Sequence, residues 1–286
     1  MTKALSLSYI PSQPRISGRG RERRFTGAAK WFKVITLLSA VFNPLLISPA
    51  KADNASRAIA QLKPSVVAIA TLHRTRVPAM KFIGTGFVVG DGQTVITNAH
   101  VVQAVGVSDA GETLGIVSGN GTLTDFREAR LINQDAERDL AQLKYDGPAL
   151  PALKIGNSDN AREGQSLLFT GFPLGMVLGF HHVTHRAMIS SITPVAIPAA
   201  SSRNLNAKLV KQLRSTPYYV FQLDGTAYPG NSGSPLYDAE SGEVFGVINK
   251  VFVKETKEAA ISQPSGITYA IPSKYIIELL DRKKTD

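Results

Sequence analysis

Past residue 53 the chain consists of short hydrophobic runs separated by residues that favour turns. The runs are rich in β-branched and aromatic residues, and most of them are bounded by glycine, proline, asparagine or aspartate. Runs of this length and composition are typical of β-strands. Ten strands are therefore predicted, at Ser65–Thr71, Phe82–Val89, Thr94–Thr97, Ala129–Ile132, Leu140–Lys144, Leu167–Thr170, Met188–Ile192, Tyr219–Leu223, Val244–Val251 and Ile267–Ile271.

Helical periodicity occurs only at the two ends of this region. A short helix is predicted at 54–62, and Ser273 is expected to cap a second helix that continues to Asp281. The fold class is therefore all-β with short terminal helices, and for a chain of 286 residues barrels or sandwiches are the available architectures. A polar segment, Ile155–Asn160, separates the strands into two halves of about 100 residues each.

The first 52 residues have the three-part plan of a secretory signal peptide. A basic leader precedes an apolar run from Val34 to Ile47, and Ala50 and Ala52 supply the small residues that a signal peptidase requires. The apolar run has 14 residues, whereas a membrane-spanning helix needs about 20. Cleavage after Ala52 is the favoured interpretation, and the alternative is an uncleaved N-terminal anchor in the membrane. In either case residues 53–286 are expected to be exported.

Most of the net charge of +10 belongs to this leader, which holds nine lysines and arginines against a single glutamate. The leader carries +8, so the remaining 234 residues carry only +2. A nearly neutral body gives no electrostatic reason to bind phosphate backbones, and nucleic acid is excluded as a main partner. The chain has no cysteine, which excludes disulfides and suits a bacterial periplasm or exterior.

Three segments carry residue types that are suited to nucleophilic catalysis. His100 follows an apolar strand in TNAHVV, and a neutral imidazole can accept and return a proton near neutral pH. Asp139 enters a strand in RDLAQL, where a carboxylate can orient a histidine. Ser232 lies between two glycines in YPGNSGSPL, and the glycines allow a tight turn that exposes the hydroxyl.

Each segment taken alone also has an ordinary structural interpretation. His100 suits a structural histidine, Asp139 a turn aspartate, and the glycines around Ser232 a simple β-turn. Together, however, the residues occur in the order His, Asp, Ser. This is the order of chymotrypsin, and it differs from the orders of subtilisin and the α/β-hydrolases.

From about Ser65 to Ser273 the chain resembles trypsin-like serine proteases of the HtrA (DegP-like) group. The resemblance rests on several segments in the right order: SVVAI, GTGFVV, TNAHVV, RDLAQLK, GFPLG, YPGNSGSPL and GITYAIPS. It implies that residues 53–286 form a protease domain of two packed six-stranded β-barrels, at about 62–157 and about 164–272. Only 14 residues follow Pro272, which is too few for the PDZ domain that many relatives carry.

The resemblance also implies an activity. The chain is expected to be an exported serine endopeptidase that cleaves proteins or peptides, in the periplasm or outside a bacterial cell. His100, Asp139 and Ser232 are the expected catalytic triad, and Gly230, Asn231 and Ser232 the expected oxyanion hole. No cofactor is expected, and relatives are often homotrimers. The alternative is a non-catalytic chaperone or binding module on a protease scaffold.

The family pattern places a substrate pocket beside the serine, lined by the residues just before it and by the strand that follows. None of these residues is acidic, so a lysine or arginine side chain of the substrate would be buried without a partner. The Gly-Ser-Pro sequence is also found in staphylococcal glutamyl endopeptidases, but Ile248 replaces their pocket histidine. Cleavage after small or medium apolar residues is therefore expected. The expected pocket residues are Thr226, Ala227, Tyr228, Val247, Ile248 and Asn249.

Three histidines within five residues raise the question of a metal site. On a strand, side chains two and four positions apart share a face, so His181 and His185 point together and His182 points away. Two ligands do not make a full zinc site. No metal site is therefore expected.

Overall fold

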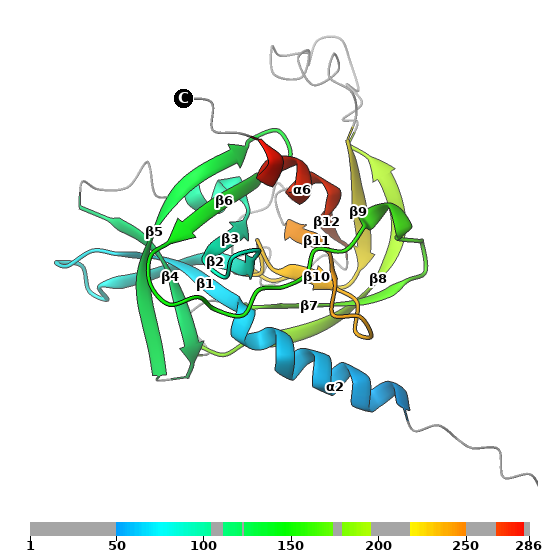
Figure 1. Ribbon diagram of the computed structural model, residues 1–286, viewed down its shortest axis with the longest axis horizontal. Coiled ribbons are helices and arrows are strands. Elements are labelled where there is room, and N and C mark those ends of the chain that lie inside the picture. The colour runs from blue at the N-terminus through cyan, green and yellow to red at the C-terminus, as the bar shows by residue number, and fades with distance from the viewer. Residues whose placement is uncertain are drawn as a thin grey trace, which may run out of the picture. The chain divides into compact units, whose positions relative to one another are not determined.

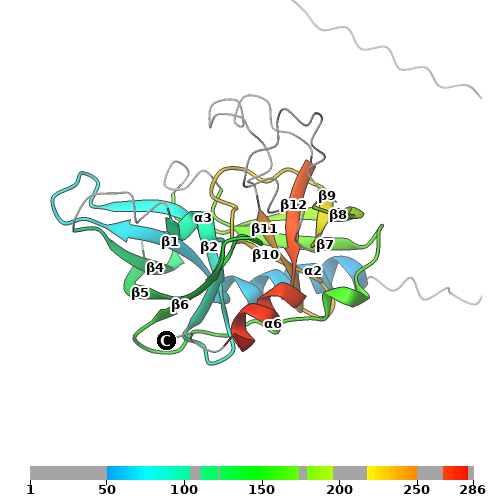
Figure 2. The same cartoon turned by 90° about the horizontal axis from the view of Figure 1, so that it is seen from above.

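The computed structural model describes residues 50–103, 111–121, 123–173, 179–195, 218–249 and 267–282. These residues form two closed β-barrels, which lie side by side in both views (Figures 1 and 2). The expectation of an all-β fold with two six-stranded barrels is confirmed. The basic leader and apolar run that were assigned to a signal peptide lie outside the described residues.

The first barrel, called the N-barrel, has the strand order β1-β2-β3-β6-β5-β4, and neighbouring strands are antiparallel. Val95 of β3 illustrates why it closes: it lies opposite Val88 on one neighbour and Leu143 on the other, and all three side chains fill the barrel interior. The strands are β1 (Val66–Leu72), β2 (Met80–Val89), β3 (Thr94–Thr97), β4 (Thr113–Asn120), β5 (Leu123–Asp135) and β6 (Leu140–Tyr145).

The second barrel, called the C-barrel, has the strand order β10-β11-β12-β9-β8-β7. Its interior is filled in the same way, since Ala270 of β12 lies opposite Ile248 and Phe221 in the core. The strands are β7 (Ser166–Gly171), β8 (Val183–Pro194), β9 (Tyr219–Asp224), β10 (Pro235–Tyr237), β11 (Val244–Asn249) and β12 (Ile267–Pro272).

The described residues include three α-helices: α2 (Ala50–Leu62), α3 (Ala99–Gln103) and α6 (Lys274–Asp281). The described residues also include two short 3-10 helices, Lys63–Ser65 and Ser158–Asn160. Both predicted terminal helices are present, and Ser273 stands at the N-cap of α6 as expected. Its hydroxyl does not cap the helix, however, because it donates a hydrogen bond to Gly156 O (2.6 Å). No helix in the described part of the chain has the length and hydrophobicity needed to cross a membrane.

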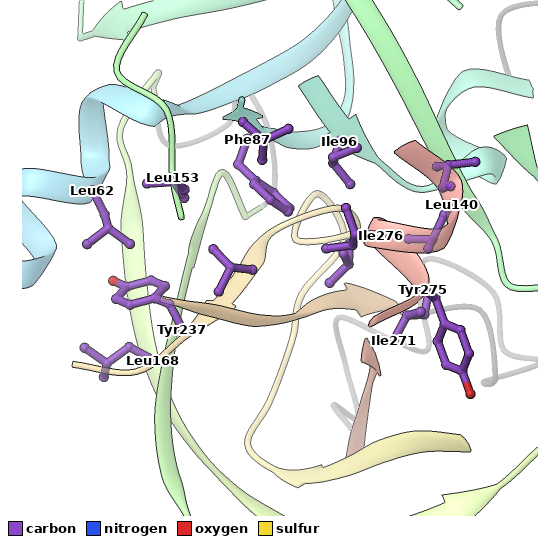
Figure 3. Close-up of a cluster of buried hydrophobic side chains, with 14 of the residues drawn as sticks. Leu62, Phe87, Ile96, Leu140, Leu153, Leu168, Tyr237, Ile271, Tyr275 and Ile276 are labelled. Carbon is purple, nitrogen blue, oxygen red and sulfur yellow. The ribbon is translucent and has the colours of Figure 1, made fainter. Parts of the chain in front are cut away.

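One buried hydrophobic cluster joins the two barrels and both terminal helices (Figure 3). Burying each large aliphatic or aromatic side chain contributes about 1.5–3 kcal/mol, so a cluster of this size holds the barrels together. A site that draws residues from both barrels depends on it. Its members include Phe87, Ile96 and Leu140 of the N-barrel, Leu168, Tyr237, Val247 and Ile271 of the C-barrel, Ile276 and Leu279 of α6, and Ala58 and Leu62 of α2.

His182, just before β8, makes a polar link between the barrels. Its Nε2 donates a hydrogen bond to Val66 O of β1 (2.9 Å), and its ring packs against Phe172 with the centroids 4.5 Å apart. Burial lowers the pKa of His182 below its usual value, and the charge of Lys63 adds to this, whereas the bond to Val66 O opposes it. The folded protein therefore favours the neutral imidazole at this position.

We expect the free energy of unfolding to decrease as the pH falls below about 6.5, because the unfolded His182 takes up a proton there and the folded one resists it. Each such proton adds at most about 1.4 kcal/mol per pH unit. His182→Gln keeps an amide donor for Val66 O and should flatten this dependence. Chemical denaturation between about pH 7.5 and pH 5 measures it.

His185 provides the comparison, because burial lowers its pKa as well. His185→Gln should flatten the pH dependence independently, and the double variant with His182→Gln should be flatter than either single variant. If all three variants lost stability on acidification as steeply as the wild type, the assignment of the pH dependence to these imidazoles would be wrong.

Candidate active site

His100 lies on α3, a short helix that is separated from the end of β3 by Asn98 alone. The helix is anchored by Val101 and Val102, which are buried in the N-barrel core. Asn98, fully buried between strand and helix, donates from its side-chain amide to Asp139 O (3.0 Å). The side chain of His100 itself stays about one-third exposed (35%), as a proton-transferring group requires.

Asp139 faces His100 from the start of β6. Its Oδ1 accepts a hydrogen bond from the backbone N–H of His100 (2.8 Å), and its Oδ2 lies 2.6 Å from Nδ1 of the ring. An ionised carboxylate can only accept, so this pairing places a proton on Nδ1 and leaves Nε2 as an acceptor. Asp139 has a φ of 56°, in the left-handed region that aspartate tolerates better than most residues.

Ser232 lies in a tight loop that is called here the serine loop (Tyr228–Ser234). Asn231 N donates to Tyr228 O and Ser234 N to Asn231 O, both at 3.0 Å, so the loop consists of two successive turns. Gly233 has a φ of 87°, and a Cβ at this position would lie only 2.0 Å from Thr85 O. Glycine is therefore required there, because a side chain would push the serine loop away from the N-barrel.

The serine loop belongs to the C-barrel but rests on β2 of the N-barrel. Thr85 N donates to Ser232 O (2.9 Å), and a Cβ at Gly84 would lie 3.3 Å from Ser232 O and 2.7 Å from Val101 of α3. The serine loop and the helix that carries His100 therefore meet at the same point of β2. Ser232 is nearly buried (7% exposed).

The predicted triad residues differ in how they are connected. Hydrogen bonds join His100 to Asp139 at two points, whereas no hydrogen bond among the described residues joins the Ser232 hydroxyl to the His100 ring. Catalytic hydrogen bonds are often long in unliganded enzymes and shorten when substrate binds.

The predicted oxyanion hole is a set of backbone donors. Among the described residues, the N–H groups of Gly230 and Ser232 have no acceptor. Gly230 has a φ of 101°, a conformation that favours glycine. Asn231 is fully buried, and neither atom of its side-chain amide has a hydrogen-bond partner in the described part of the chain.

The predicted pocket residues lie on two segments. Thr226, Ala227 and Tyr228 are partly buried just before the serine, and Ala227 N donates to Thr268 Oγ1 (3.0 Å) on β12. The Tyr228 ring lies 6.0 Å from the ring of His185. The segment is therefore fixed by β12 and by an aromatic contact.

The other predicted pocket residues lie on β11, where alternate side chains point to opposite sides. Val247 is fully buried in the inter-barrel cluster, and Ile248 is fully buried inside the C-barrel. Gly233 N donates to Ile248 O and Ile248 N to Ser234 O, both at 2.9 Å, so β11 supports the serine loop through its backbone. Asn249 is buried at the end of the strand.

His182 and His185 lie in different surroundings. His185 stacks on Phe169 inside the C-barrel with the ring centroids 4.9 Å apart, and its Nε2 is buried without a partner among the described residues. His182 packs between the barrels, as described above. The described residues contain no group of three or more side chains able to hold a metal ion.

Two residues that hold the site are absent from the sequence prediction. Thr85 and Asn98 are fully buried polar residues that bond to the backbone of Ser232 and Asp139. Both lie in segments that carry the family resemblance, GTGFVV and TNAHVV. The sequence does show that both are polar residues in or directly after a hydrophobic predicted strand.

Comparisons with known proteins agree with this geometry. The family model for a trypsin-like peptidase domain matches residues 84–247. Probable periplasmic serine endoproteases described as DegP-like are similar in sequence: one from Ectopseudomonas mendocina (strain ymp) is 33% identical over 205 residues, and one from Marinomonas sp. (strain MWYL1) is 31% identical over 207. Each match covers 71% of this chain, which spans about a third of those relatives' length (35% and 36%).

Solved structures give the same result. An HtrA-type protease, AlgW with tripeptide, superimposes with a TM-score of 0.55 at 26% identity, covering 79% of this chain and 62% of that one. The crystal structure of Deg5 has a TM-score of 0.57 at 22% identity and covers 80% and 93%, which supports the fold. With a family model that matches more than half of its residues, the chain belongs to the trypsin-like peptidase family, as an HtrA-type serine protease.

Proposed function

We propose that this protein is an exported serine endopeptidase that hydrolyses peptide bonds of proteins with His100, Asp139 and Ser232. The observation that carries the proposal is the doubly hydrogen-bonded pair of His100 and Asp139, which lies on the N-barrel where the serine loop of the C-barrel rests. The relatives are named as probable periplasmic endoproteases, which supports a periplasmic location and protein or peptide substrates.

The proposed reaction proceeds in two stages. His100 Nε2 removes the hydroxyl proton of Ser232 as the oxygen attacks the peptide carbonyl, and Asp139 stabilises the imidazolium that forms. The carbonyl oxygen becomes an oxyanion, which accepts hydrogen bonds from the N–H groups of Gly230 and Ser232. The C–N bond then breaks, and His100 protonates the leaving amine. A water molecule, deprotonated by the same ring, hydrolyses the acyl-enzyme and regenerates the Ser232 hydroxyl.

The test is covalent labelling by a fluorophosphonate, which reacts with activated serines. The purified protein should be labelled at Ser232, as identified by peptide mapping, and it should cleave casein. If the protein bound casein or peptides without being labelled or cleaving them, it would be a binding module on the protease scaffold and the proposal would be wrong.

We further propose that cleavage follows small or medium apolar residues such as valine, alanine or leucine. The proposed pocket residues Thr226–Tyr228 are partly buried and carry no charge, and Val247–Asn249 on β11 are buried and uncharged, so a charged substrate side chain would lose its hydration without gaining a partner. Discrimination among apolar residues should be weak, since one methylene in an apolar pocket is worth about 1–3 kcal/mol. Profiling on a peptide library measures this preference, and dominant cleavage after glutamate, lysine or arginine would contradict it.

A further inference from the structure

Thr85 connects three parts of the structure through four hydrogen bonds. It lies on β2 and is fully buried. Its N–H donates to Ser232 O (2.9 Å), and its hydroxyl donates to Gly230 O (2.7 Å). The same hydroxyl accepts from Phe172 N (3.1 Å), and Thr85 O accepts from the Thr97 hydroxyl (2.7 Å). Thr85 is thus fixed by β3 and holds the serine loop at two carbonyls.

These two carbonyls lie on either side of Asn231, in the segment that supplies the oxyanion-hole donors. Gly230 has a φ of 101° and no side chain, so the peptide groups around it can rotate at little steric cost. A rotation of the peptide between Gly230 and Asn231 changes ψ of Gly230 and φ of Asn231, two of the angles that fix how the N–H groups of Gly230 and Ser232 are oriented relative to each other. The hydrogen bond from Thr85 to Gly230 O opposes this rotation directly.

We propose that the Thr85 hydroxyl is a positioning residue that keeps the N–H groups of Gly230 and Ser232 aimed at one oxyanion. The inference rests on the proposed function of the serine loop and extends it to the facing barrel. In this proposal the Thr85 hydroxyl, on β2 of the N-barrel, fixes the geometry of the serine loop of the C-barrel.

The chemistry of the hydroxyl makes this role specific. A threonine hydroxyl has one proton and two lone pairs. Phe172 N–H occupies one lone pair, so the single proton is directed to Gly230 O. Phe172 is itself held by the stacked ring of Phe180, with centroids 4.5 Å apart. Since Thr85 is fully buried, solvent cannot replace the bond if the hydroxyl is removed.

Thr85→Val tests the proposal, because valine has nearly the same shape and lacks the hydroxyl. We expect kcat for a peptide substrate to fall about 10- to 100-fold with KM changed little, since misplaced oxyanion donors weaken binding of the transition state and not of the substrate. The rate of fluorophosphonate labelling at Ser232 should fall in parallel, because phosphonylation uses the same donors.

Thr170→Val is the matched control. Thr170 of β7 is equally buried, and its hydroxyl bonds to Thr184 Oγ1 (2.8 Å) and Tyr237 OH (2.7 Å), away from the serine loop. Both substitutions remove a buried hydroxyl with two partners, so both should lower the thermal unfolding temperature. Only Thr85→Val should lower kcat and slow the labelling.

A second pair of variants serves if Thr85→Val does not fold. Thr85→Ser and Thr85→Ala both lack the methyl group and differ only in the hydroxyl, so the serine variant should retain near wild-type kcat and the alanine variant should lose it. The inference would be overturned if the serine and alanine variants had equal kcat, or if Thr85→Val and Thr170→Val had equal kcat. As long as Ser232 of the wild type is labelled, either result would leave the proposed function intact. Failure of the wild type to be labelled at Ser232 would overturn both.

Discussion

Replacing Ser232 by alanine should abolish both fluorophosphonate labelling and casein cleavage. The hydroxyl is the proposed nucleophile, and without it the His100–Asp139 pair has no group to activate, so the proteolytic rate should fall by about a million-fold. The fold should survive, because alanine fits wherever serine does and the backbone bond from Thr85 N to Ser232 O remains. Activity assays combined with thermal unfolding separate the two effects.

Ser234→Ala is the matched control for this experiment. Ser234 lies two residues further along the same loop, and its buried hydroxyl has no hydrogen-bond partner in the described part of the chain. Its removal should therefore leave labelling and cleavage near the wild-type level. Casein cleavage at the full rate by Ser232→Ala, or loss of labelling only in Ser234→Ala, would show that the wrong serine has been assigned.

Asp139→Asn should lower kcat/KM by about 10⁴-fold while leaving the site almost unchanged in shape. In the wild type one carboxylate oxygen accepts from His100 N and the other lies 2.6 Å from Nδ1. An asparagine has only one acceptor oxygen. If this oxygen stays on the backbone N–H, the amide NH₂ faces Nδ1 and forces the ring proton onto Nε2. The ring can then no longer accept the proton of Ser232.

His100→Ala should cost about as much as Ser232→Ala, and the double variant with Asp139→Asn should be no worse than His100→Ala alone, because the residues act as a unit. Steady-state kinetics on a peptide substrate measures all three variants. Asp135→Asn is the control: this buried aspartate pairs with Arg138 and Arg282, so its loss should lower stability and spare kcat. A fall of less than tenfold for Asp139→Asn would contradict its proposed role.

The strands that the sequence did not predict show where local patterns fail. β4 (Thr113–Asn120) contains two glycines, which weaken a strand pattern. The structure explains one of them: a Cβ on Gly115 would lie 2.4 Å from the ring of Phe126, which covers the strand. β10 has only three residues and begins with proline, so its pairing with β7 and β11 is set by closure of the barrel. Neither cause is visible in the local sequence.

The candidate site divides in the same way. His100, Asp139 and Ser232 were predicted because short motifs surround them and their order along the chain is distinctive. The left-handed backbone of Asp139, the amide of Asn98 and the hydroxyl of Thr85 were not predicted. Asn98 contacts Asp139, which lies 41 positions further along the chain, and Thr85 contacts Gly230, which lies 145 positions further along. Only the folded chain brings these residues together.

The position of α2 has a consequence for processing of the N-terminus. Ala58 and Leu62 belong to the inter-barrel cluster and Ala55 and Ile59 pack against it, whereas the side chains at positions 60 and 61 are exposed. Removal of helix residues from Ala55 onward uncovers apolar surface shared by both barrels, because Ala55 is the first described residue of the helix that packs against this cluster. A truncation that extends past Asn54 should therefore loosen the contact between the two barrels.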